Sequence, residues 1–244
     1  VYAGDYSPFR QRHHGQPLGN ASGHRLLGYL QNHDQIGNRA RGERIGHLVS
    51  EGRARIGAAL VLLSPYVPML FQGEEWGASA PFQYFTDHQT PELADAVRKG
   101  RREEFAQFGW DPAQVPDPQA ESTFRASQLD WTELTRSPFK ERLAFYRALL
   151  ALRRSTPDLL DGRRDRVQVS FDEGARWLRL QRGTVSLLAN LGERRLELPR
   201  PAGDLRIAFP ERGEQAGARE RSPFVLEPES CYVFVAGALK AADA

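Results

Sequence analysis

The pattern of apolar and polar positions divides the chain into two parts of different character. In the first part, short apolar runs over 26–30 and 67–71 are typical of buried strands. A helical stretch over about 51–63 separates them, and its second half is apolar nearly all round, which predicts a heavily buried helix. From about residue 158 onward, short runs alternate between apolar and polar residues and end in turn residues, which is typical of antiparallel strands.

Two further helices are predicted between these parts. One is capped by Thr90 and has Pro91 at its first position. The other begins after Ser137-Pro138, closes at Thr156-Pro157 and carries apolar residues at helical spacing. The resulting order of strand, helix, strand, long loop and helix predicts two βα units.

The predicted fold class is therefore α/β. Residues 1–158 are expected to form the C-terminal part of a (β/α)8 barrel, namely its last two βα units, with a long loop over 73–136 and an irregular loop over 1–25. Residues 159–244 are expected to form an antiparallel β-sandwich domain. Because two βα units cannot close a barrel, we expect further protein on the N-terminal side to complete it.

Composition narrows the possible partners. The 244 residues carry a formal net charge of +2, so the total charge gives no reason to expect nucleic acid binding, and the basic cluster at 98–102 is interpreted as a solvated helix face. The single cysteine, Cys231, excludes a disulfide within the chain, and no Cys/His spacing suggests zinc. No apolar run is long enough to span a membrane and no signal sequence opens the chain, so a cytoplasmic location is expected.

Polar side chains with sugar-binding chemistry follow both predicted strands of the first part. Asn32, His33 and Asp34 come after the first strand and are expected to fan out at its tip. A carboxylate accepts two hydrogen bonds and an imidazole donates one, so this pair can bridge neighbouring hydroxyl groups. Glu75 and Trp76 follow the second strand, and an indole can cover the apolar face of a pyranose.

These segments resemble a known family. Leu30-Gln31-Asn32-His33-Asp34 and Phe71-Gln72-Gly73-Glu74-Glu75-Trp76 resemble the seventh and eighth strand endings of the α-amylase family of retaining glycoside hydrolases. Within it, the chain is similar to the maltooligosyltrehalose trehalohydrolases, and the segments that carry this narrower resemblance lie at 32–40, 85–88, 97–105 and 108–112.

The resemblance implies an activity and site roles. Asp34 would be the third family carboxylate, which stabilises the oxocarbenium-like transition state, and His33 would bind the same sugar hydroxyls. The expected reaction cleaves the α-1,4 glucosidic bond next to the terminal trehalose of maltooligosyltrehalose, without metal or cofactor. The family's nucleophile and general acid lie in motifs that this chain does not contain, so we expect this chain alone to be inactive, with the missing N-terminal part as its partner.

Other residues are also candidates for substrate binding, and for several of them a purely structural role is the alternative. They are Asn32, Gln35, Glu75, Trp76, Phe85, Asp87 and His88. The two aromatic rings could equally pack in the core, and the polar pair at 87–88 could merely order its loop. A glycogen branching enzyme, another α-amylase-family enzyme and a non-catalytic glucan-binding protein remain as alternative functions.

Overall fold

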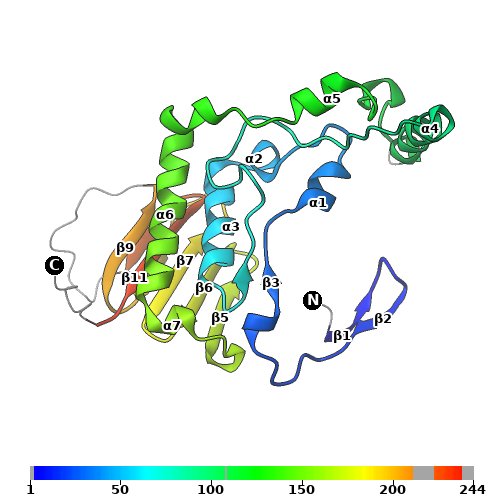
Figure 1. Cartoon of the computed structure of the whole chain (residues 1–244). Coiled ribbons are helices and arrows are strands. Elements are labelled where there is room, and N and C mark those ends of the chain that lie inside the picture. The colour runs from blue at the N-terminus through cyan, green and yellow to red at the C-terminus, as the bar shows by residue number, and fades with distance from the viewer. Residues whose placement is uncertain (1–2, 108, 211–222, 238–244) are drawn as a thin grey trace.

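The computed structural model describes residues 3–107, 109–210 and 223–237 (Figure 1). Two long helices, α3 (Glu51–Leu63) and α6 (Phe139–Ser155), lie against a β-sheet, while α4 (Pro91–Gln107) and α5 (Glu121–Ala126) extend away from it (Figure 1). Phe108, which begins one of the family-like segments, lies outside the described residues.

The first part contains one parallel strand pair. β3 (Leu27–Gly28) pairs in parallel with β4 (Val67–Pro68), and the chain between them includes α3. The backbone bonds Val67 N to Leu26 O and Met69 N to Gly28 O, each 2.9 Å, hold the pair. Both strands are much shorter than predicted, because a strand needs a ladder partner and the structure pairs these two only over that short register. Their place as the last two units of a barrel stays a prediction.

The predicted helices are confirmed at close to their predicted bounds. Ser50 caps α3 by accepting a hydrogen bond from Arg53 N at 3.2 Å, and Ser64-Pro65 ends it because the residue before proline avoids helical geometry. The long segment 73–136, predicted as a loop with one helix in it, contains α4, α5 and shorter helical elements. The remaining helical elements are η1 (Gly23–Arg25), α1 (His33–Gly37), α2 (Ile45–Leu48), η2 (Pro112–Gln114), η3 (Trp131–Thr135), α7 (Pro157–Leu160) and η4 (Arg164–Arg166).

The prediction of an irregular N-terminal segment was wrong in part. β1 (Ala3–Ser7) and β2 (Arg12–Gly15) form an antiparallel hairpin. Both strands are largely exposed and polar, so they lack the alternation by which a half-buried strand is recognised in a sequence.

The C-terminal part is antiparallel, as predicted. A five-stranded sheet has the order β5-β6-β7-β11-β9, and β8 pairs with β10 beside it. The strands are β5 (Val167–Asp172), β6 (Trp177–Arg182), β7 (Val185–Asn190), β8 (Leu196–Leu198), β9 (Asp204–Phe209), β10 (Phe224–Leu226) and β11 (Ser230–Val235). β10 was not predicted from the sequence, because it has only three residues.

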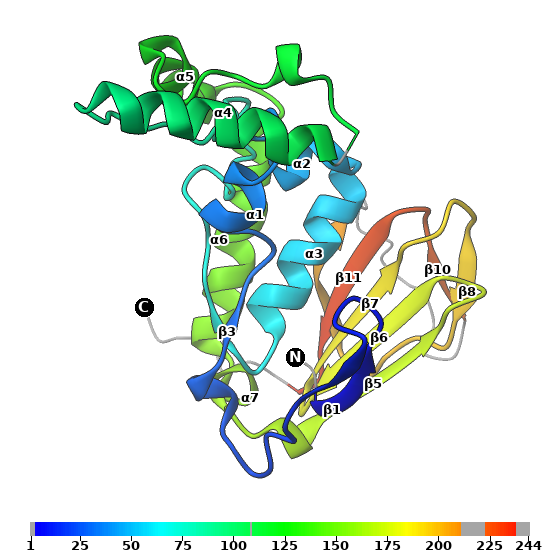
Figure 2. The ribbon, with the colours of Figure 1, turned by 90° about the vertical axis from the view of Figure 1, so that its right-hand side faces the viewer.

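One hydrophobic core joins the helices to the sheet. Buried residues of α3, α6 and α7 pack with those of β6, β7, β9 and β11, including Cys231. Figure 2 shows α3 beside β11 of the sheet. The core therefore crosses the predicted domain boundary near 158, and that boundary stays a prediction. Within the described residues, none of the helices combines the length and apolarity needed to cross a membrane.

Two arginines tie the end of α3 to the neighbouring elements. The last carbonyls of a helix lack partners within it, and a cation there is favourable. Arg153 of α6 donates to Leu62 O at 2.6 Å and Ser64 O at 2.8 Å, and Arg182 of β6 donates to Ser64 O at 2.7 Å. These bonds fix the C-terminal end of α3 to α6 and to the sheet.

Candidate active site

The family-like motif begins a short helix. Asn32 has extended backbone and caps α1, because its Oδ1 accepts a hydrogen bond from Asp34 N at 2.7 Å. Gln35 Oε1 accepts in return from Asn32 N at 2.9 Å, which completes a capping box. Ile36, which is 1% exposed, anchors the helix in the protein. The sequence of the motif thus encodes a sharp entry into a helix.

This geometry corrects the expected position of the motif. We predicted that Asn32, His33 and Asp34 would fan out at a strand tip, but β3 ends at Gly28 and His33 and Asp34 occupy the first turn of α1. The capping box is the physical reason, since two reciprocal hydrogen bonds favour helix initiation over continued extension. The Asn32 and Gln35 side-chain oxygens, predicted to bind substrate, accept backbone hydrogen bonds here.

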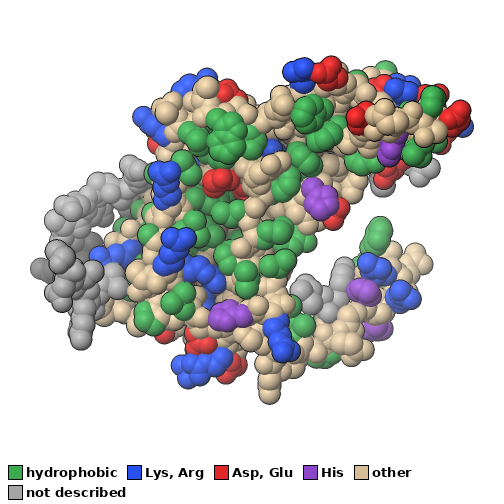
Figure 3. Space-filling view, in the orientation of Figure 1, with side chains coloured by type: hydrophobic (Ala, Val, Ile, Leu, Met, Phe, Trp, Pro, Cys, Tyr) green, Lys and Arg blue, Asp and Glu red, His purple; other side chains and the backbone are tan. Residues whose placement is uncertain are grey.

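His33 and Asp34 form an exposed pair. His33 Nε2 lies 3.3 Å from Asp34 Oδ1, and their side chains are 71% and 64% exposed. In the space-filling view the surface is hollowed between the part that carries α1 and α4 and the N-terminal hairpin (Figure 3). A carboxylate and an imidazole held side by side at the surface can receive neighbouring hydroxyl groups of a sugar.

The two segments that follow β3 and β4 meet at Gln31 and Glu74. Gln31, directly before the motif, is 3% exposed, and its side chain lies within hydrogen-bonding reach of Glu74. Glu74, in the turn after β4, is also 3% exposed and accepts a hydrogen bond from Tyr146 OH at 3.2 Å. Burial raises the pKa of Glu74 to about 7, although the hydrogen bonds from Gln31 and Tyr146 oppose that rise.

Glu75 and Trp76 have different surroundings. Glu75 is half-buried, whereas Trp76 is 2% exposed and its Nε1 donates to Glu133 Oε2 at 3.0 Å. A second ring, Trp131, packs on the Trp76 indole with centroids 5.2 Å apart. This burial contradicts the prediction that Trp76 stacks on a sugar and favours its core interpretation, since an indole this covered leaves no face for a pyranose.

The later candidates lie in the segment between the turn after β4 and α4. Phe85 is 37% exposed and makes edge contacts with Phe82 and Phe124. Asp87 is exposed and accepts from Gln89 Nε2 at 3.0 Å, while His88 is half-buried and its backbone N–H donates to Gln119 Oε1 at 3.1 Å. These contacts order the segment, and the sugar-binding roles of the three residues stay predictions.

Arg101 is a residue that the sequence analysis did not single out. We interpreted the cluster at 98–102 as a solvated helix face, but Arg101 Nη2 donates to Gly37 O at 2.6 Å and its guanidinium lies over the Tyr84 and Phe105 rings. Arg101 therefore holds the C-terminal end of α1, where a cation is favourable. The surrounding aromatic residues were the available signal, because arginine stacks readily on such rings.

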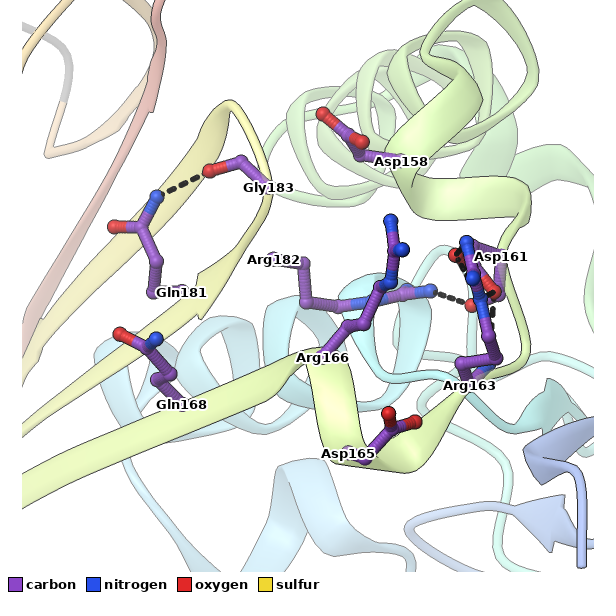
Figure 4. Close-up of a pocket in the computed structure, with 9 residues that line it drawn as sticks. All are labelled: Asp158, Asp161, Arg163, Asp165, Arg166, Gln168, Gln181, Arg182 and Gly183. Carbon is purple, nitrogen blue, oxygen red and sulfur yellow. Dashed lines mark hydrogen bonds and ion pairs between the residues drawn. The ribbon is translucent and has the colours of Figure 1, made fainter.

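A separate polar pocket of about 370 Å³ lies where the helices meet the sheet (Figure 4). Its charged groups are largely engaged within the protein. Asp161 and Arg163 form an ion pair of 2.6 Å, Asp158 accepts from Thr184, and Arg182 donates to backbone carbonyls. Groups paired in this way stabilise the junction, so we do not place the sugar here. Among the described residues, no group of three or more His, Cys, Asp or Glu side chains could hold a metal ion.

Comparisons with known proteins agree with these motifs. The chain is 47% identical over 213 residues to a malto-oligosyltrehalose trehalohydrolase from Brevibacterium helvolum, a match that spans 86% of this chain and 36% of the relative. The corresponding protein of Arthrobacter ramosus is 55% identical over 155 residues, which are 63% of this chain and 27% of the relative. The resemblance to malto-oligosyltrehalose trehalohydrolases is confirmed. The chain spans only about a third of the length of these trehalohydrolases.

Solved structures and a family model also match this chain. A crystal structure from Salmonella typhimurium, described as that of a candidate alpha amylase, matches with a TM-score of 0.81 and 34% identity over 97% of this chain and 39% of that one. Isomaltulose synthase from Klebsiella sp. LX3 shares the fold, with a TM-score of 0.54 at 18% identity over 86% of this chain and 42% of that one. Residues 162–233 match a domain of unknown function, DUF3459.

Proposed function

We propose that this chain is part of a retaining α-glycosidase that releases trehalose from maltooligosyltrehalose. The enzyme would cleave the α-1,4 glucosidic bond next to the terminal trehalose unit. The observation that carries the proposal is the exposed His33–Asp34 pair, held at 3.3 Å in the motif that the trehalohydrolase resemblance covers. The cytoplasmic location stays a prediction.

In this mechanism, Asp34 and His33 hold the sugar at the cleavage site. The Asp34 carboxylate accepts hydrogen bonds from two ring hydroxyls, and His33 donates one from its imidazole. As the ring flattens toward the oxocarbenium-like transition state, these contacts strengthen, which supplies several kcal/mol in glycosidases generally. Asp34 is the transition-state stabiliser, and Asn32, Gln35, Glu75, Phe85, Asp87 and His88 are the proposed surrounding contacts.

The reaction also needs a nucleophile and a general acid. Retaining hydrolysis uses two carboxyl groups roughly 5 Å apart on either side of the bond. We propose that both come from an N-terminal part of the same protein, which is in keeping with relatives that are much longer than this chain. "Full-length protein" below means this chain together with that part.

Product analysis tests the proposal. Full-length protein incubated with maltooligosyltrehalose is expected to release trehalose and a shorter maltooligosaccharide, whereas the 244 residues alone are expected to release none. New α-1,6 branches formed from a linear glucan would instead identify a branching enzyme. Glucan binding without any change in the glucan would identify a non-catalytic binding protein.

A further inference from the structure

We infer that Glu74 is a positioning residue for the His33–Asp34 pair and acts on it through Gln31. This inference rests on the proposed function, because it assigns Glu74 a role in that same site. Glu74 itself is not expected to touch the sugar, since its side chain is buried.

The contact chain from Glu74 to the motif is short and enclosed. Tyr146 OH donates to Glu74 Oε1 at 3.2 Å, and Gln31 lies within hydrogen-bonding reach of the same carboxyl. Gln31 Oε1 accepts a hydrogen bond from Ile45 N at 2.8 Å. Gln31 thus joins three segments, and the next residue along the chain is Asn32, which caps the helix that carries the pair. A shift of Gln31 would be passed directly to that cap.

The charges around Glu74 make its ionisation consequential. Glu75 in the same turn adds a second negative charge, and Tyr146 of α6 donates a hydrogen bond to the Glu74 carboxyl. Arg44, just before α2, interacts electrostatically with Glu74, and Arg142 of α6 interacts electrostatically with Tyr146. Within the described residues, Glu74 Oε2 and Arg44 Nη2 are buried without hydrogen-bond partners, so no direct ion pair neutralises the carboxylate.

These surroundings couple the positioning to pH. A buried carboxyl whose pKa is raised from 4.5 to about 7 is neutral in the folded protein at pH 5 and charged at pH 8. The stabilisation of the folded state by the neutral carboxyl is complete below pH 4.5 and is lost as the pH rises through about 7. Charging Glu74 strengthens the hydrogen bonds that Gln31 and Tyr146 donate to its carboxyl, so the hold on Gln31, and through Gln31 on the cap, changes with pH.

A substitution series in the full-length protein tests the inference. Glu74→Gln keeps the size and hydrogen-bonding capacity of the side chain but cannot ionise, whereas Glu74→Ala removes the support. We expect turnover to fall at least tenfold in Glu74→Ala and less than threefold in Glu74→Gln, with little change in KM. Glu133→Gln is the matched control, because Glu133 is 2% exposed but bonds to Trp76 and Ser79 instead of Gln31.

A second measurement does not depend on activity or on the survival of Glu74→Ala. The amide resonance of Ile45, observed by isotope labelling, reports on the bond to Gln31. We expect the change in its shift near pH 7 to be smaller in Glu74→Gln than in the unsubstituted protein and in Glu133→Gln. Comparison with the unsubstituted protein cancels the contributions of nearby histidines, which all three proteins share.

The outcomes separate the two proposals. An Ile45 titration that is unchanged in Glu74→Gln, or full turnover in a folded Glu74→Ala protein, would overturn the positioning role. Absence of trehalose release from the unsubstituted protein would overturn the proposed function instead, while the Ile45 titration would still test the coupling of Glu74 to Gln31.

Discussion

The α1 turn and the junction pocket of Figure 4 both gather charged side chains, but they use them differently. In the α1 turn, His33 and Asp34 are largely exposed and their ionic groups face solvent. In the junction, Arg182 is 3% exposed and its guanidinium donates to the carbonyls of Leu63 and Ser64. Burial lowers the pKa of Arg182 to about 10, which reflects the desolvation that those bonds must offset.

This difference in burial separates charged groups that stabilise the fold from charged groups that can bind a ligand. Buried charge that is satisfied by backbone groups stabilises a junction, because its removal leaves polar groups without partners. Exposed charge on a short helix contributes little to folding and is available to a ligand. The two regions should therefore respond in opposite ways to substitution.

Arg182→Met should produce the largest loss of stability. Several buried carbonyls would lose their donor, at about 1–3 kcal/mol each before relaxation, so we expect unfolding to become easier by about 4 kcal/mol. Activity per folded molecule should be unchanged. Denaturant unfolding of the full-length protein measures this, with Arg166→Met as the control, since Arg166 lines the same pocket but is exposed. Equal losses in the two variants would mean that the Arg182 bonds do not stabilise the junction.

Asp34→Ala should show the opposite response. Loss of a transition-state contact of about 3 kcal/mol corresponds to a turnover about a hundredfold lower. The free energy of unfolding should change by less than about 0.5 kcal/mol, because the side chain is exposed. Steady-state kinetics and denaturant unfolding on the same preparation check both. Near-normal turnover would remove Asp34 from the site.

Arg101→Met should affect both properties, which sharpens the comparison. Its guanidinium bonds to the end of α1 and stacks on two rings, so we expect a loss of about 2 kcal/mol in stability. Turnover should also fall, since α1 carries the pair. Arg102→Met, an exposed neighbour on the same helix, is the control for the loss of one positive charge. A stability loss with unchanged turnover would restrict Arg101 to folding.

Phe85→Ala should have the smallest effect. If the partly exposed ring stacks on the sugar, its removal costs about 1 kcal/mol, which is about a fivefold weaker affinity for maltooligosaccharides. Isothermal titration measures the affinity. Phe171→Ala provides the comparison, since this ring is 59% exposed on β5 in the C-terminal sheet. The same affinity in both variants would assign Phe85 to loop packing.

Local signals in the sequence were sufficient for most of the fold. The cap at Thr90-Pro91 and the stop at Ser64-Pro65 are properties of adjacent residues, so the start of α4 and the end of α3 follow from them. Alternation likewise identified most of the antiparallel strands. The resemblance of the segment 30–34 identified the His33–Asp34 pair from the sequence.

Tertiary structure alone decided which polar groups are buried and what they contact. Gln31 and Glu74 are 43 positions apart and meet only because β3 and β4 pair in parallel. Trp76 follows its strand in the way that a sugar-stacking ring would, yet Glu133 and Trp131 enclose it. The sequence by itself determined the local turns, helix limits and the chemical types available, because these depend on neighbouring residues. Burial and long-range contact depend on how distant segments pack, so only the folded chain separates a residue that binds from one that supports.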